Sequence, residues 1–190
     1  MDAEGPWIQS TSGRVWSLTN PRVEDVDLAD IAHALGNLCR FNGHSCMFFS
    51  VAEHSLLVAD VVEPELRVYG LLHDAHEAWT GDISTPMKLL LSPELECIQE
   101  SIDRVIHEAC GLAWPLSDEM QMYVAVADRY VLALERGYMM RDCPREWPGE
   151  LLPVRLSSSP FMPLGPREAA SRWLEEVYIC LPHMRPAEDV

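Results

Sequence analysis

The chain has 190 residues and a mass of 21.5 kDa, which suits one domain, residues 1–190, with its own hydrophobic core. Hydrophobic residues make up 48% of it and charged residues 23%, which argues against a disordered or fibrous protein. Because 30 acidic residues outnumber 14 basic ones, the formal net charge is −16 and the surface repels a phosphate backbone. Duplex nucleic acid is therefore not expected as a partner.

The first half of the chain predicts a small β-hairpin and three helices. β-favouring residues on both sides of a Ser-Gly pair predict the hairpin within residues 7–21. Apolar residues at helical spacing predict a helix over 23–40, with Asp25 or Asp27 available as its N-cap. Ser50 can cap a second helix over 50–64, and a third is expected to run without a break over 64–80.

The second half predicts a loop over 82–86 and a short helix over 87–91. Two long helices follow over 92–111 and 117–140, then a proline-rich loop over 143–166 and a last helix over 167–180. In the helix over 117–140, the residues expected to face the core are Tyr123, Val124, Ala127, Val131 and Leu134. The sum is an all-α domain of about six or seven helices, with a possible small N-terminal β-hairpin.

No signal for secretion or membrane insertion is recognised in the sequence. The first residues lack a basic segment followed by an apolar run, and no stretch approaches the ~18 uninterrupted apolar residues of a membrane helix. The 6 cysteines include no C-x-x-C pair, so reduced thiols in a cytosol are the simplest interpretation. We expect an unprocessed cytoplasmic protein without membrane contact.

Three apolar helix faces each carry a side chain that should not be buried alone. His54 lies within an apolar stripe, and His73 and Asp74 follow two leucines. Asp128 has valines three or four positions away on each side. Buried carboxylates pair with a cation or coordinate a metal because an isolated buried charge is costly. Two imidazoles and two carboxylates from three helices would form a mixed nitrogen and oxygen shell for one divalent transition ion.

Each of these residues also has an ordinary explanation. His54 could be a hydrogen-bonded core histidine, and the pair His73-Asp74 occurs by chance in many chains. Asp128 could form an ion pair with Arg104 or Arg129. Taken together, three chance insertions of ligand residues into apolar stripes are less probable than one site that requires them all.

A second group of polar residues follows the first in the sequence. Glu77 is four residues after His73, so a continuous helix would place both on one face, with Glu77 near a water or substrate on the metal. Asp82 follows in the loop. Lys88 is the only lysine in the chain, which suggests that a compact ammonium is required there, although a solvent-exposed lysine is the simpler alternative.

The segment Arg40-Phe41-Asn42-Gly43-His44 is a third candidate. The guanidinium of Arg40 suits bidentate phosphate binding, and Phe41 could stack on a base, so that together they would hold a nucleotide. Alternatively, Arg40 satisfies carbonyls at the end of a helix and Phe41 packs in the core. His44 could support the site from behind or lie in a loop.

The motifs in this order resemble those of the HD-domain phosphohydrolases. They are SVAEHS at 50–55, LLHDAHEAWTGDISTPMK at 71–88 and AD at 127–128. Within that superfamily the chain is most similar to small 5′-deoxynucleotidases and to short phage-type enzymes that include dATP triphosphohydrolases. The resemblance covers a motif core of about 12–134, leaving a C-terminal extension of about 143–190. It implies an all-α HD-domain helical bundle.

The resemblance also implies a role for each matching residue. His54, His73, Asp74 and Asp128 match the metal ligands. Glu77 matches a catalytic acid or base, and Asp82 a polar residue near the sugar. Arg40 and Phe41 look like the phosphate-binding arginine and base-stacking aromatic of this group, with phenylalanine where related deoxynucleotidases have tryptophan.

The implied activity is metal-dependent hydrolysis of a deoxynucleotide. One divalent ion, Co, Mn, Zn or Fe, is expected in each chain, with additional Mg possible on the substrate phosphates, to which Lys88 would also bind. The preferred substrate is a deoxynucleoside triphosphate such as dATP, split into deoxynucleoside and triphosphate. The alternatives are a 5′-deoxynucleotidase that releases orthophosphate from monophosphates, and a non-catalytic helical module with a structural metal. A homo-oligomer is expected, in the host cytoplasm if a phage encodes the chain.

Overall fold

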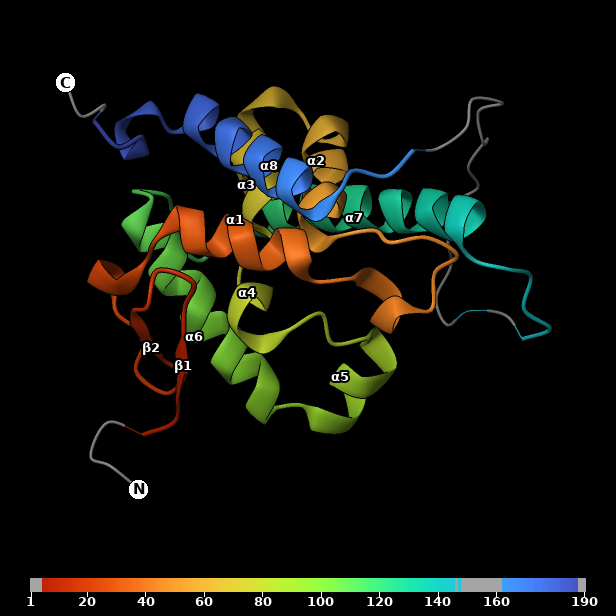
Figure 1. Cartoon of the computed structure of the whole chain (residues 1–190), viewed down its shortest axis with the longest axis horizontal. Coiled ribbons are helices and arrows are strands. Elements are labelled where there is room, and N and C mark those ends of the chain that lie inside the picture. Colours follow the sequence, from red (N-terminus) through yellow and green to blue (C-terminus); the bar gives the residue numbers. More distant parts are fainter. Residues whose placement is uncertain (1–4, 146, 148–161, 188–190) are drawn as a thin grey trace.

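A computed structural model describes residues 5–145, 147 and 162–187 of the chain. Figure 1 shows helices throughout and a small antiparallel hairpin near the N-terminus. The predicted all-α architecture with an N-terminal hairpin is therefore confirmed. Most of the predicted loop over 143–166 lies outside the described residues, and its described parts contain no helix or strand before Pro166, where the last helix begins. None of the helices in the described ranges is long and apolar enough to cross a membrane.

The hairpin is fixed to the helical body by aromatic stacking. Strand β1 (Trp7–Gln9) pairs with β2 (Val15–Ser17), with Ile8 opposite Trp16. The Trp16 side chain is buried and its ring stacks on that of Trp79, with ring centroids 4.4 Å apart. This contact joins the hairpin to the segment that follows the predicted ligands His73 and Asp74.

The first predicted helix is shorter than expected, because the later of its two predicted N-cap candidates, Asp27, is the one that caps it. A 3₁₀ turn (Val23–Asp25) comes first, and α1 (Leu28–Asn37) begins after Asp27, whose carboxylate accepts hydrogen bonds from two backbone amides of the first turn. The helix ends at Asn37, and Arg40–Gly43 forms a separate turn. Ser50 caps α2 (Val51–Val61) as predicted.

The third predicted helix is interrupted at the residues of most interest. A turn (Pro64–Leu66) leads into α3 (Arg67–Leu72), and α4 (Glu77–Thr80) begins only after a tight turn. Within that turn, backbone hydrogen bonds join residues three apart, as from the amide of Glu77 to the carbonyl of Asp74 at 3.0 Å. The expectation of one unbroken helix over 64–80 is therefore wrong, and the tighter winding changes which side chains share a direction.

The remaining helices agree with the predicted order. They are α5 (Thr85–Leu91), α6 (Glu94–Ala109), α7 (Asp118–Met139) and α8 (Pro166–Cys180). On α7 the predicted core residues Val124, Ala127 and Val131 are buried, whereas Tyr123 is 46% exposed and Leu134 is only partly buried. The buried stripe is narrow because α7 packs on the body mainly through α2.

Helix α2 lies at the centre of the bundle, where it packs against α1, α3, α7 and α8 (Figure 1). Its approach to α3 depends on Gly70, where an added Cβ would lie 2.9 Å from the Cα of Ala59. Backbone atoms cannot yield to such a contact as a flexible side chain can. The close spacing of α2 and α3 brings their polar residues within reach of one another.

Candidate metal centre

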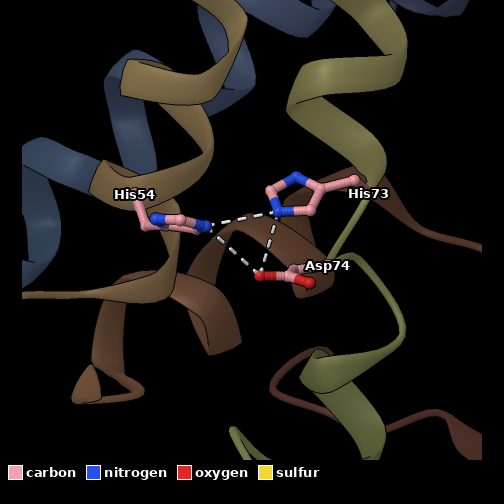
Figure 2. Close-up of side chains that lie close together, drawn as sticks. All are labelled: His54, His73 and Asp74. Atoms are coloured by element: carbon pink, nitrogen blue, oxygen red, sulfur yellow. Dashed lines mark hydrogen bonds and ion pairs between the residues drawn. The ribbon is translucent and has the colours of Figure 1, made fainter. Parts of the chain in front are cut away.

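His54 of α2 is the centre of a cluster of nitrogen and oxygen atoms. Its side chain is completely buried, and Nε2 lies 3.1 Å from Asp128 Oδ1 and 3.3 Å from His73 Nε2. Asp74 Oδ2 lies 3.7 Å from the same nitrogen (Figure 2). Helix α2, the turn after α3, and α7 therefore bring all four predicted metal ligands to one place.

The separations suit ligands of a single ion. Atoms of His54, His73 and Asp74 lie within 4.8 Å of one another, and His73 Nε2 is 3.2 Å from Asp74 Oδ2. Two atoms each about 2.1 Å from one ion are about 3.0–3.7 Å apart at angles of about 90–125°. Asp128 contacts this group through His54. The cluster could hold a divalent ion, and mixed imidazole and carboxylate donors suit a transition metal.

The Nδ1 atom of each histidine is held by a hydrogen bond, which leaves Nε2 available to bind a metal ion. His73 Nδ1 donates a hydrogen bond to the carbonyl of Gly70 at 2.8 Å. His54 Nδ1 donates to Glu135 Oε1 at 2.6 Å. With Nδ1 bound in this way, the Nε2 atom of each ring is left for the cluster, where its lone pair could bind a metal ion. In the ion-free protein, a proton on His54 Nε2 can be donated to Asp128, and one on His73 Nε2 to Asp74.

In the ion-free cluster, the carboxylates and the histidines shift one another's pKa values. Burial lowers the pKa of His73, but the charges of Asp74 and Asp128 and the hydrogen bonds to Asp74 and to the Gly70 carbonyl together raise that pKa to about 9. Burial raises the pKa of Asp74, yet protonated His73 and the charges of His54 and Arg40 hold it well below its usual range. Protons and a metal ion therefore compete for these side chains.

Glu135 is a buried member of the site that the sequence analysis missed. It is 1% exposed and binds His54 Nδ1 through one oxygen and Arg40 Nε, 3.0 Å away, through the other. Glu135 lies four residues after Val131 on the buried stripe of α7, so a carboxylate in an apolar stripe was the available signal. Its position behind His54 is typical of a residue that orients a metal ligand.

Arg40 lies at the cluster, in an ion-paired position. Its residue is 8% exposed, and Nη1 lies 3.8 Å from Asp74 Oδ2 in addition to the Nε bond to Glu135. This geometry differs from the alternative of an arginine bound to helix-terminal carbonyls. The guanidinium neutralises the carboxylates on both sides of His54.

The residues after Arg40 adopt an unusual backbone. Phe41 and Asn42 have φ values of 56° and 51°, in the left-handed region that non-glycine residues rarely occupy. The Phe41 ring is partly buried and meets the ring of Trp147 edge-on, with centroids 6.0 Å apart. His44 is exposed, and within the described residues its side chain forms no hydrogen bond or ion pair with the cluster.

The second predicted group borders the cluster. Glu77 is 2% exposed, and Lys88 Nζ donates to its Oε1 at 3.4 Å. Burial raises the pKa of Glu77 well above its usual range, and the charges of Asp74 and Asp82 raise it further. Burial also raises the pKa of Asp82, on which Arg40 and Lys88 act in the opposite direction. Among the described residues, the predicted site residue that remains apart is His44.

The alternative ion pair for Asp128 is not formed with Arg104. Arg104 Nη1 lies 3.4 Å from Glu108 on its own helix, whereas Asp128 contacts His54. The Asp128 side chain is 38% exposed, compared with 13% for His73 and 16% for Asp74. The cluster is therefore closed behind His54 and partly open to solvent at Asp128.

Comparison with known proteins identifies relatives that match most of the chain. No protein-family model matches it. Over 170 residues the chain is 36% identical to YfdR of Escherichia coli (strain K12), covering 89% of this chain and 92% of YfdR. The chain belongs to the family of YfdR. An alignment of that length leaves 20 of the 190 residues unaligned, so it contains the segment from Arg40 to Glu135.

The YfdR family extends to a second bacterium. Over 138 residues the chain is 32% identical to RCAP_rcc00048 of Rhodobacter capsulatus, covering 68% of this chain and 70% of that protein. YfdR and RCAP_rcc00048 are both named as uncharacterized proteins, so the family membership carries no activity with it. The chemistry of this YfdR relative must be inferred from its own site.

Proposed function

We propose that this protein is a metal-dependent phosphohydrolase that acts on deoxynucleotides. The observation that carries the proposal is the cluster of His54, His73, Asp74 and Asp128, which is buried on one side and open on the other. A structural metal site is closed by its protein ligands, whereas a catalytic site keeps a position for water or substrate. The order of the motifs, which resembles HD-domain phosphohydrolases, supports the same function.

The four clustered residues would hold one divalent transition ion. When bound, such an ion supplies Lewis acidity toward a phosphoryl oxygen and lowers the pKa of a bound water. Arg40 and Glu135 keep His54 in place and limit the net charge around it. Asp128, the most exposed of the four, lies on the side from which substrate would enter.

Glu77 would move the proton of the reaction. It is buried beside Asp74, with Lys88 as its cationic partner at 3.4 Å. The raised pKa of Glu77 favours its protonated form in the ion-free protein, from which it could protonate the departing nucleoside oxygen. As a carboxylate it would instead accept a proton from the attacking water. Either role requires a position beside the metal ligands.

Lys88 and Arg40 would compensate the charge of the substrate phosphates. Lys88 is better suited to direct contact, because its side chain is 32% exposed whereas that of Arg40 is 10% exposed and paired with two carboxylates. Phe41, next to Arg40, would stack on the base, with Trp147 against its edge. We prefer dATP as substrate, with a deoxynucleoside monophosphate as the alternative.

Product analysis tests the proposal directly. The Mn²⁺-loaded protein is incubated separately with dATP and dAMP, and the products are resolved by chromatography. Deoxyadenosine and triphosphate from dATP support the preferred substrate, and orthophosphate from dAMP alone supports the nucleotidase alternative. Bound metal without hydrolysis of any nucleotide in a panel would contradict the enzymatic function. His54→Ala, which removes the central ligand, serves as the inactive control.

A further inference from the structure

A second group of potential ligands lies beside the metal centre. Asp74, His76 and Glu77 each have a nitrogen or carboxylate oxygen within 4.8 Å of those of the other two. The tight turn between α3 and α4 brings them together, because residues three apart eclipse one another where the chain winds with three residues per turn. Asp74 and Glu77 are three residues apart, and the Glu77 amide donates to the Asp74 carbonyl, so their side chains lie on the same side of the turn.

Two atoms of this group are buried without a partner. His76 is 7% exposed and Glu77 2%, and His76 Nε2 and Glu77 Oε2 have no hydrogen bond within the described part of the chain. Burial of such atoms costs about 1–3 kcal/mol each unless a partner compensates it. An unpaired ring nitrogen and an unpaired carboxylate oxygen on neighbouring residues are both electron-pair donors, so a cation would satisfy both.

His76 is held in the same manner as the metal-binding candidate His54. His76 Nδ1 lies 3.0 Å from Asp103 Oδ1 on α6, as His54 Nδ1 lies 2.6 Å from Glu135 Oε1 on α7. In each case a carboxylate from another helix accepts a hydrogen bond from the Nδ1–H group and leaves the Nε2 lone pair for a metal ion. A carboxylate behind a histidine is the usual outer partner of a metal ligand.

The charge around the two groups also leaves room for a second cation. Counted as ionised, six carboxylates face two permanently charged cations within the described residues of this region. They are Asp74, Glu77, Asp82, Asp103, Asp128 and Glu135, with Arg40 and Lys88. One divalent ion at His54 would leave a net charge of about −2, which a second divalent ion would neutralise.

We infer that Asp74, His76 and Glu77 form a second divalent-cation site, with Asp74 shared between the two sites and Asp103 as the residue that orients His76. An imidazole with carboxylates selects Mn²⁺, Fe²⁺ or Zn²⁺ over Mg²⁺ or Ca²⁺. Paired metals in enzymes are about 3.5–4 Å apart and act together on both sides of a phosphoryl group. An ion at this site would keep Glu77 as a carboxylate, and Glu77 would then accept a proton instead of donating one.

Metal stoichiometry tests the inference without reference to activity. The protein is stripped with a chelator, dialysed against Mn²⁺, and analysed for metal per chain and by electron paramagnetic resonance. The wild type should bind two ions, and two Mn²⁺ that share a carboxylate should lose the resolved hyperfine signal of an isolated ion. His76→Ala should bind one ion and regain that signal. Asp103→Asn should weaken the second ion by about 10- to 100-fold.

Two controls separate this inference from the proposed function. His107 is a 3% exposed histidine of the same region whose Nδ1 binds the backbone carbonyl of Asp103, so His107→Ala should keep both ions. His54→Ala removes the central ligand of the first ion and should therefore lose that ion. A wild type with one ion, lost in His54→Ala but kept in His76→Ala and Asp103→Asn, would overturn the second site and leave the first intact. If a folded His76→Ala protein lost both ions equally, the second site would also be overturned, because His76 should bind the second ion alone.

Discussion

Replacement of Glu135 by glutamine tests how the buried side of the metal centre is built. The Glu135 carboxylate accepts from His54 Nδ1 at 2.6 Å and from Arg40 Nε at 3.0 Å. A glutamine amide has one oxygen and one NH₂ group, so Glu135→Gln can accept from one donor but must turn its own donor toward the other. The variant loses a charge-assisted hydrogen bond and leaves the buried guanidinium with Asp74, 3.8 Å away, as its remaining carboxylate.

The expected cost has two parts that can be measured separately. Removal of one partner from a buried ion pair costs about 3–5 kcal/mol, and because one hydrogen bond survives we expect about 3 kcal/mol. For a chain of this size that corresponds to a decrease of about 6–12 °C in the Tm of the metal-free protein. Loss of the carboxylate behind His54 should also weaken metal binding about 10- to 100-fold.

Both effects are measured on purified protein. Thermal denaturation in the presence of a chelator gives the Tm, and competition with a fluorescent chelator gives the Kd for Mn²⁺. Glu119→Gln, an exposed position on the same helix, is the matched control and should leave both values unchanged. A Glu135→Gln protein with the Kd and Tm of the wild type would refute the role assigned to this carboxylate.

Four further changes give distinct results. Asp128→Ala should lose the ion at His54 on dialysis, and metal analysis that finds it retained would contradict Asp128 as a ligand. Glu77→Ala should keep that ion while kcat falls by about 10²- to 10⁴-fold, the usual effect of removing a general acid or base, and a near-normal kcat would exclude the role. Gly70→Ala should lower the free energy of unfolding by about 1–3 kcal/mol in urea denaturation, because its Cβ would overlap α2. His107→Phe should weaken the pH dependence of stability, because it removes a buried imidazole whose pKa is lowered by burial.

Much of the fold follows from local signals in the sequence. Ser50 accepts a hydrogen bond from the first turn of the helix that it was predicted to cap, and Ser117 does the same at the start of the helix predicted over 117–140. These helices begin where expected because a side-chain oxygen satisfies an otherwise unpaired backbone amide, which is a local event. The hairpin at residues 7–21 likewise depends on a nearby turn.

The break between α3 and α4 could not be read from the same signals. Apolar spacing near His73 is compatible with backbone bonds to either the third or the fourth preceding residue. The choice depends on tertiary contacts such as the stacking of Trp79 on Trp16, more than 60 residues away in the chain. Glu77 was expected beside the metal ligands because one continuous helix would carry it and His73. That reason was wrong, because the helix is interrupted between them.

The candidate ligands were predictable because each is a polar side chain at an apolar position. Their partners divide into two kinds. Glu135 interrupts the buried stripe of α7 in the same way as His54 interrupts that of α2, so the same reasoning could have identified it. The pairing of His76 with Asp103 joins a turn to a separate helix, and spacing along the chain does not encode that distance.

The pH dependence of stability can be predicted from His107, which lies outside the metal centre. His107 is 3% exposed, and burial lowers its pKa from the ordinary value of 6.5, partly opposed by the hydrogen bond to the Asp103 carbonyl. The unfolded chain therefore binds a proton at a higher pH than the native protein does. Stability from this residue is fully present above about pH 6.5 and decreases as the pH falls below it, by at most about 1.4 kcal/mol per pH unit.

His107→Phe removes the titrating group and keeps an aromatic ring against Trp114, whose centroid is 4.8 Å from that of His107. The difference in free energy of unfolding between variant and wild type should move in favour of the variant as the pH falls from 7 to 5. Urea denaturation in a chelator measures it without contributions from bound metal. His33→Phe, at an exposed position, controls for loss of a histidine without loss of a buried one. A difference that stays constant with pH, or moves in favour of the wild type in acid, would show that the imidazole of His107 is not kept neutral by the fold.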